Sequence, residues 1–382
     1  MSVITRVPMS HRERILRTFE FKRVDRTACD LMEGQVWKGL AQYFELECGL
    51  RSDFEVFDFL DTDCRWVFLN YNGPILIDGE AGINADGDIL GIATLYALKC
   101  SGTGFSTGFA NGTSMKDMIG TYSDDAAARP LKGAETLGEV DGYPWVDPSW
   151  WQVPDFAAVR NRWPDHALVL HPGWFPLFCG AANAFGMEDA LIRMIGQPKL
   201  LIAFLEKQHA VYMDILQRAV GSARGKCDIC WLGDDYASQD SMLFSPELWR
   251  RYIKPFLKEQ VDCIRDAGMH VLFHSCGAVR AILEDLIGIG VDGLLVFQTT
   301  ASGMDAQSIS RDFGGRMVFY GGIDCQRVLT SGSLQEVRSE VDLNRNCFSK
   351  CGGYIVANTH HGVDGIRGAN IVEMCRAAHD PF

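Results

Sequence analysis

The sequence predicts an α/β fold, a (β/α)8 barrel built on eight buried parallel strands, and two observations support it. Short apolar runs recur along the chain and end in polar or glycine-containing turns, which is typical of buried parallel strands. Amphipathic stretches lie between several of these runs, and alternation of strand with helix implies a parallel sheet. A chain of 382 residues can form one large barrel or two ordinary domains.

The first element is expected to be a helix that leads into the body of the fold. It runs from Ser10 to Phe21, begins at a capping residue, and carries Ile15, Leu16 and Phe19 on one face. The eight predicted strands lie near Cys29, from Cys64, up to His171, and from Asp228, His270, Gly293, Arg316 and Tyr354. Helices are predicted over 187–212, 246–267 and 278–289.

Residues from Tyr71 to Trp151 interrupt this alternation. They are rich in Gly, Asp, Ser and Thr, so we expect an extended insertion with a hairpin between Gly87 and Leu98. No repeat, low-complexity tract or Pro-rich linker divides the chain. We therefore expect one elaborated domain over residues 1–382.

Charge and composition narrow the classes of partner. The chain has 36 basic and 49 acidic residues, and its net charge of -13 disfavours nucleic acid and anionic membranes. It has no run of 18 apolar residues and no apolar signal segment, so a cytoplasmic protein is expected. The 13 scattered cysteines are expected to be reduced thiols, most of them buried apolar filler. A small molecule or a protein is the expected partner.

Polar side chains follow six of the predicted strands. In a barrel the carboxyl ends of all strands meet at one mouth, so groups far apart in sequence would surround one cavity. Each residue alone is more simply a cap or a loop residue. The set comprises His171, Asp234, Asp235, His274, Cys276, Gln298, Asp324, Cys325, His360 and His361.

The segment His-Ser-Cys places His274 and Cys276 two positions apart. Residues i and i+2 of an extended segment point the same way, so both side chains can bind one ion. Zinc takes N and S ligands, and a catalytic zinc has three protein ligands with one open position. We expect His360 as the third ligand, with Cys325 and His361 as alternatives. The competing interpretation is a buried histidine beside an inert cysteine.

Two further groups are candidates for the mouth. The neighbouring carboxylates Asp234 and Asp235 match a catalytic base with its orienting group, although an Asp before a helix is often only an N-cap. Trp174, Phe175 and Phe178 can line a pocket for a flat ligand. Core packing is the simpler role for at least two of these three rings.

Several stretches together resemble the uroporphyrinogen-decarboxylase-like superfamily. They are HRERILRTFEFKRVDR, WLGDDYASQDSMLFSPELWRRYIKPFLKEQV, HVLFHSCGAV, LIGIGVDGLLVFQ, FYGGIDCQRVL and GGYIVANTHHGVDGIRGANI. The similarity is greatest to the corrinoid-dependent methyltransferase branch, which includes methylcobamide:coenzyme M methyltransferases. It implies a (β/α)8 barrel with the active site in its mouth, and it allows a homodimer.

In that branch a zinc ion, held by an HxC pair and a later Cys, activates a thiol, and methyl passes between this thiol and the cobalt of a separate corrinoid protein. The resemblance assigns His274 and Cys276 to the pair and replaces the later Cys by His360. It implies a small methyl donor or acceptor, such as a methyl ether, a methylamine or a thiol. The catalytic candidates are Asp234, Asp235, Gln298 and Asp324. The substrate-binding candidates are His171, Trp174, Phe175, Gln239 and His361.

The alternative function is a decarboxylase that acts on a tetrapyrrole or another carboxylic acid and needs no metal. Uroporphyrinogen decarboxylases carry an MRQAGR-type segment near the N-terminus, and the corresponding region here, CDLMEGQVWKGLAQYF, lacks these arginines. Arginine is the residue suited to bidentate carboxylate binding. Its absence argues against a substrate with many carboxylates.

Overall fold

The computed structural model describes residues 9–71, 82–83, 89–90, 130–143, 145–360 and 365–381. Eight parallel strands form one curled sheet in the order β1-β12-β11-β10-β9-β8-β7-β2. The strands are β1 (Ala28–Cys29), β2 (Cys64–Phe68), β7 (Ala167–His171), β8 (Ile229–Gly233), β9 (His270–His274), β10 (Gly293–Phe297), β11 (Val318–Ile323) and β12 (Tyr354–Asn358). Each corresponds to one of the eight predicted runs, and the predicted (β/α)8 barrel is confirmed.

The two end strands of the sheet meet at Asp63, just before β2. Its backbone N–H donates to the carbonyl of Cys29 in β1 at 2.8 Å, and its carboxylate accepts from the Cys29 N–H at 2.8 Å. These two bonds join β1 to β2 and bring the sheet round into a ring. Because the strands are parallel, all their carboxyl ends lie at one end of this ring, which we call the mouth.

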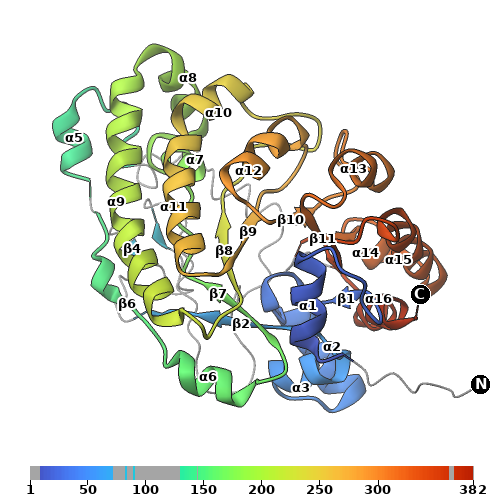
Figure 1. Cartoon of the computed structure of the whole chain (residues 1–382). Helices are drawn as coiled ribbons and strands as arrows, with labels where there is room; N and C mark the ends of the chain where they lie inside the picture. Colours follow the sequence, from blue (N-terminus) through green and yellow to red (C-terminus); the bar gives the residue numbers. More distant parts are fainter. Residues whose placement is uncertain are drawn as a thin grey trace, which may run out of the picture.

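Helices surround the strands, as Figure 1 shows. In chain order they are α1 (His11–Phe19), α2 (Lys38–Cys48), α3 (Asp53–Leu60), α5 (Leu137–Asp141), α6 (Phe156–Arg162), α7 (Leu177–Phe185), α8 (Met187–Gly196), α9 (Pro198–Ala223), α10 (Pro246–Tyr252), α11 (Lys254–Asp266), α12 (Leu283–Ile289), α13 (Ala306–Phe313), α14 (Val328–Ser331), α15 (Leu334–Phe348) and α16 (Gly368–His379). The described residues also contain three 3-10 turns: η1 (Met32–Gly34), η3 (Pro148–Trp150) and η4 (Arg280–Ile282). Not one helix in the described ranges has the length and apolar character needed to cross a bilayer.

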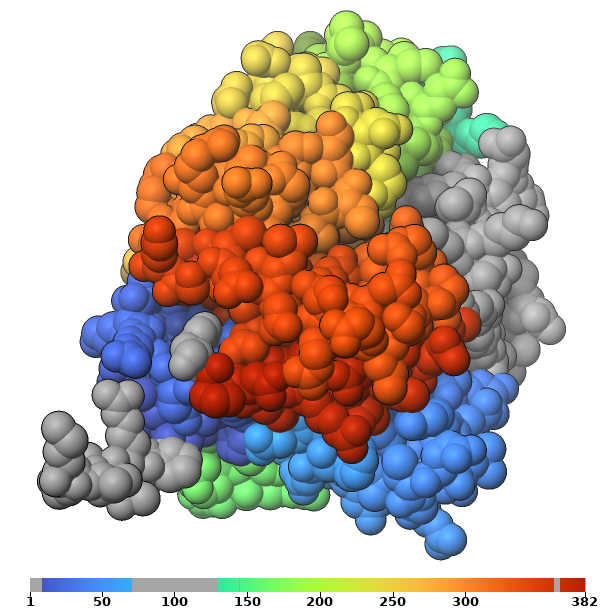
Figure 2. Space-filling view, turned by 90° about the vertical axis from the view of Figure 1, so that its right-hand side faces the viewer, coloured from blue at the N-terminus to red at the C-terminus, as the bar shows by residue number. Residues whose placement is uncertain are grey.

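The predicted N-terminal helix is confirmed as α1, with the Ser10 hydroxyl accepting from the Glu13 N–H. Ile15 and Phe19 are buried against residues that point into the ring, so α1 closes the end opposite the mouth. Figure 2 shows the C-terminal residues, in red, lying against the N-terminal helices, in blue. The first and last parts of the described chain thus meet on one side of the molecule.

The predicted long helices are interrupted where the backbone cannot continue. The helix expected over 187–212 divides at Gln197 into α8 and α9, and α9 begins at Pro198, which lacks an amide donor. The helix expected over 246–267 divides at Ile253, two residues before Pro255, for the same reason. The helix expected over 278–289 begins instead with the turn η4.

The described part of the predicted insertion contains two short antiparallel strand pairs. The strands β3 (Asn70–Tyr71) and β6 (Trp151–Gln152) join its two ends, and β4 (Gly82–Ile83) pairs with β5 (Ile89–Leu90). The second strand of this hairpin lies in the predicted range, whereas the first lies before it. The remainder of the range predicted for the hairpin is outside the described residues.

Candidate active site at the mouth of the barrel

His274 is the last residue of β9, and Cys276 follows it at the mouth. The His274 Nε2 atom lies 3.6 Å from the Cys276 Sγ atom, as expected for side chains two positions apart in an extended segment. The same Nε2 atom lies 3.6 Å from Oδ1 of Asp235, which follows β8. Ligand atoms of these three residues all lie within 4.8 Å of one another. We call Asp235, His274 and Cys276 the mouth cluster.

The backbone holds the mouth cluster in place. The Asp235 carboxylate accepts from the Cys276 N–H at 2.7 Å, so two neighbouring strand ends are tied together. Gly277 has φ +81°, and an added Cβ would lie 2.3 Å from the Ser238 carbonyl oxygen, so only glycine fits this turn. The Gln298 Oε1 atom accepts from the Gly277 N–H at 2.8 Å and joins the third strand end, that of β10.

The carboxylate of Glu33 lies on the other side of the imidazole. Its Oε1 atom accepts from the His274 Nδ1 atom at 2.7 Å, and both side chains are only 6% exposed. Glu33 lies in η1 after β1 and has φ +54°, a left-handed conformation rare for residues with a Cβ. Because a carboxylate can only accept, Nδ1 carries the proton and Nε2 is directed to the mouth cluster.

These neighbours set the charges of the site. Burial alone would raise the pKa of Asp235, but His274, the Cys276 N–H and the charge of His360 outweigh it and hold this pKa below its usual value. Burial raises the pKa of Cys276 to about 11. Burial would lower the pKa of His274, but Glu33, Cys276 and Asp235 outweigh it and raise this pKa well above its usual value. The His274 ring thus lies between two carboxylates, those of Glu33 and Asp235.

The other candidate ligands lie at neighbouring strand ends. His360 follows β12 and is half-buried; it is outside the mouth cluster, although its charge acts on Asp235. Cys325 follows β11 and is 1% exposed; burial raises its pKa to about 12, and the charges of Asp324 and Cys276 add to the rise. His361 lies outside the described residues. Asp235, predicted as a catalytic acid or base, is the third member of the mouth cluster, and His360 as a zinc ligand stays a prediction.

Asp234 has different partners from Asp235. Its carboxylate accepts from the backbone N–H groups of Phe178 at 2.6 Å and Cys179 at 3.0 Å, in the first turn of α7. Burial raises its pKa to about 7, although these N–H groups oppose the rise. Asp234 therefore caps α7, a helix that precedes it in the chain, from a neighbouring strand end.

Three aromatic rings enclose the cluster from the β7 and β8 sides. Trp174 is half-buried, and its ring meets the His274 ring edge-on at 5.2 Å. The His171 ring stacks on Trp231 at 4.0 Å, and burial lowers the pKa of His171 to about 4, so this imidazole is neutral at neutral pH. These rings give the mouth a flat wall beside the imidazole.

The remaining candidates contact other parts of the fold. Phe175 packs in the core between Tyr212 and Trp151. The Asp324 Oδ1 atom accepts from the Gln326 N–H at 2.8 Å, as a loop cap does. The Gln239 carbonyl accepts from the Ser302 N–H at 2.8 Å, which links the β8 and β10 loops.

Sequence reasoning missed Glu33, Asp30 and Asn358. Asp30 follows β1 inside the ring, accepts from Trp66 Nε1 at 2.9 Å and from the Tyr320 hydroxyl, and burial raises its pKa to about 6. The Asn358 side chain accepts from the Met32 N–H at 3.1 Å and donates to the His360 carbonyl at 2.8 Å. The strand-end rule applied to β1 and β12 would have found Asp30 and Asn358.

Comparison with known proteins places the chain in a family. Residues 178–381 match the uroporphyrinogen decarboxylase (URO-D) family, so the chain belongs to that family. A methyltransferase from Methanosarcina mazei has the same fold over 97% of this chain and 98% of its own, with a TM-score of 0.60 and 15% identity.

Two curated relatives match a shorter segment. The methylcobamide:CoM methyltransferase MtaA of Methanosarcina barkeri is 26% identical over 113 residues, and that of strain Fusaro is 28% identical over 113 residues. Each match spans 30% of this chain and 31% of the relative. The chain thus matches less than a third of the length of these relatives.

Proposed function

We propose that this protein is a zinc-dependent methyltransferase, which moves a methyl group between a small substrate and the cobalt of a corrinoid held by a partner protein. The observation that carries the proposal is the mouth cluster, which brings a nitrogen, a sulfur and an oxygen ligand together beside an aromatic wall. The fold shared with a methyltransferase and the partial match to methylcobamide:CoM methyltransferases support this reaction class.

The spacing of the cluster fits zinc. Zinc–nitrogen and zinc–sulfur bonds of about 2.0–2.1 Å and 2.3 Å at a tetrahedral angle put the two ligand atoms about 3.6 Å apart. The Nε2–Sγ distance between His274 and Cys276 is 3.6 Å. Asp235 is the third ligand of the proposed site. His360 after β12 and Cys325 after β11 are the alternative third ligands. A catalytic zinc needs three protein ligands and one position open to the substrate.

When bound, the ion would supply a Lewis acid that stabilises the negative charge on the substrate sulfur or oxygen as its bond to methyl forms or breaks. The protein supplies the orientation. Glu33 fixes the imidazole so that Nε2 is the ligand, and Asp235 holds the Cys276 backbone. Gln298 accepts from Gly277 through Oε1, which leaves its amide N–H groups to hold the substrate. Trp174 excludes water from one side.

The experiment is an anaerobic assay with the purified protein and methylcobalamin, in which the cobalt spectrum reports loss of methyl to a thiol acceptor such as coenzyme M. We expect transfer that stops on treatment with a zinc chelator and returns with added zinc. An active enzyme that contains no metal would contradict the proposal and favour the decarboxylase alternative. No transfer to thiols and no demethylation of ethers or amines in the reverse direction would also contradict it.

Glu33→Gln is expected to weaken zinc binding by about 10–100-fold, because Glu33 is the outer partner of a ligating histidine. Competition with a chromogenic chelator measures this affinity. Glutamine at φ +54° has the same backbone strain as glutamate, so the variant changes the charge alone. An unchanged zinc affinity would show that Glu33 has only a packing role.

A further inference from the structure

The seam between the first and last strands of the ring is short. The strand β1 has only two residues, and they pair with Ile355 and Val356 of β12. One further backbone bond, from the Asp30 N–H to the Val356 carbonyl at 3.0 Å, extends the pairing toward the mouth. A parallel pair of this length forms few ladder hydrogen bonds, so side chains at its two ends add further links.

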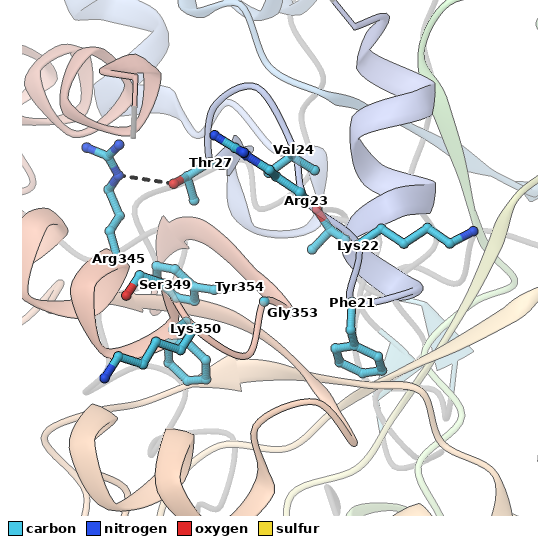
Figure 3. A pocket seen from close by; sticks show the side chains of 13 residues that line it. Phe21, Lys22, Arg23, Val24, Thr27, Arg345, Ser349, Lys350, Gly353 and Tyr354 are labelled. Atoms are coloured by element: carbon cyan, nitrogen blue, oxygen red, sulfur yellow. Dashed lines mark hydrogen bonds between the residues drawn. The ribbon is translucent and has the colours of Figure 1, made fainter.

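At the amino ends of the two strands the link is a buried arginine. Arg345 of α15 is 8% exposed and donates through Nε to Thr27 Oγ1 at 3.0 Å, and Thr27 directly precedes β1. Figure 3 shows this bond beside a cavity whose lining includes Gly353, the residue before β12. This end of the seam lies opposite the mouth, and the proposed function makes no use of it.

At the carboxyl ends the link is Asn358, the last residue of β12, which is fully buried. Its Oδ1 atom accepts from the Met32 N–H at 3.1 Å, and its Nδ2 atom donates to the His360 carbonyl at 2.8 Å. Met32 is the first residue of η1, the turn that carries Glu33. One amide side chain therefore holds both the turn that supplies the carboxylate partner of His274 and the backbone of a candidate third ligand.

The turn η1 is strained where Glu33 lies. Glu33 has φ +54° and ψ +21°, the left-handed region that residues with a Cβ rarely adopt. A conformation of this kind persists only when the surrounding structure enforces it. The next residue, Gly34, lies so close to Trp66 of β2 that an added Cβ would be 2.3 Å from the Trp66 Cδ1 atom. The turn is therefore packed against β2 on one side and bound to β12 by Asn358 on the other.

We propose that Asn358 is a positioning residue for the mouth cluster. It holds the Glu33 carboxylate against His274, and through the His360 carbonyl it sets the start of the loop that carries the candidate ligands His360 and His361. The second role rests on the proposed zinc-dependent function, whereas the first concerns the protein without metal. Asparagine suits both roles because its amide accepts and donates at once, which an ionised carboxylate does not.

Hydrogen exchange in the metal-free full chain tests the first role. With isotope-labelled histidine, we expect the His274 Nδ1 proton, assigned by its loss in His274→Gln, to exchange slowly because the buried Glu33 carboxylate holds it. In Asn358→Ala this proton should exchange about tenfold faster or more, because the turn loses a hydrogen bond. Thr27→Val is the matched control: it removes the bond at the other end of the seam and should change the rate less than about twofold.

A double-mutant cycle on zinc affinity, measured by chelator competition, tests the second role. Asn358→Ala should weaken zinc binding by about tenfold or more, because it disturbs the outer partner of a ligating histidine. The loss in the double variant Asn358→Ala and Glu33→Gln should be smaller than the product of the two single losses, because both act on the same contact. The losses in Thr27→Val and Glu33→Gln should multiply.

A wild-type exchange rate in Asn358→Ala, or an equal acceleration in Thr27→Val, would overturn the inference. Losses of zinc affinity that multiply in the double variant with Asn358→Ala would also overturn it. A protein that shows the expected exchange rates but binds no zinc would contradict the proposed function and still support the positioning of Glu33. Melting temperatures check that the variants are folded. Asn358→Ser, whose hydroxyl is too short to reach both partners, replaces Asn358→Ala if that variant does not fold.

Discussion

Cys276→Ala is expected to lower the zinc content of the purified protein from about one ion per chain to near zero. The thiolate is one of three ligands that the mouth cluster offers, and His274 and Asp235 alone leave the ion with too few. Loss of an outer partner of a ligand costs about 10–100-fold, so loss of the ligand itself should lower methyl transfer by more than about a hundredfold. Elemental analysis and the cobalamin assay measure the two effects.

The control for this variant is Cys347→Ala. Cys347 is a half-buried thiol in α15, far along the chain from the mouth cluster. It should keep its zinc and its activity. Full zinc content in Cys276→Ala would show that the metal binds elsewhere. Loss of zinc with full activity would show that the reaction does not need the metal.

Asp63→Asn is expected to lower the free energy of unfolding by about 3–5 kcal/mol, the cost of leaving a buried charge without its partner. Asp63 is fully buried and pairs with Arg14 at 2.5 Å and with Arg26 at 3.0 Å. Urea denaturation measures the change. Asp61→Asn is the control: Asp61 is 53% exposed, its φ of +53° suits asparagine, and its ion pair with Arg26 is worth at most about 1 kcal/mol.

The same carboxylate gives stability a defined pH dependence. Burial would raise the pKa of Asp63, but His11, Arg26 and Arg14 outweigh it and lower this pKa in the folded protein. Its contribution is therefore complete above the unfolded value of about 3.9 and is lost as the pH falls toward the folded value. Asp25, which pairs with Arg14, has a pKa of about 2. Stability should fall between about pH 4 and pH 2, and less steeply in Asp63→Asn. An equally steep fall of stability with pH in both proteins would show that Asp63 does not cause this pH dependence.

The ring could be predicted from sequence because most residues of its strands are apolar and buried. His274 and Cys276 could be predicted as a pair because residues i and i+2 of an extended segment point the same way, whatever the rest of the fold does. Glu33 was missed because its contact with His274 joins residues 241 positions apart and depends on a backbone turn with positive φ. The roles of Asp234 and Asp235 also depend on neighbours from other elements. Two identical residues that are adjacent in sequence do not show which of them contacts which neighbour.

The contact between Glu33 and His274 has a consequence for how the protein acquires its metal. Glu33, which orients the imidazole, is synthesised 241 residues before His274. We therefore expect tight zinc loading only after the first strand has docked beside the last. Metal uptake during refolding would then report completion of the ring, and a chain arrested before docking should hold the ion weakly.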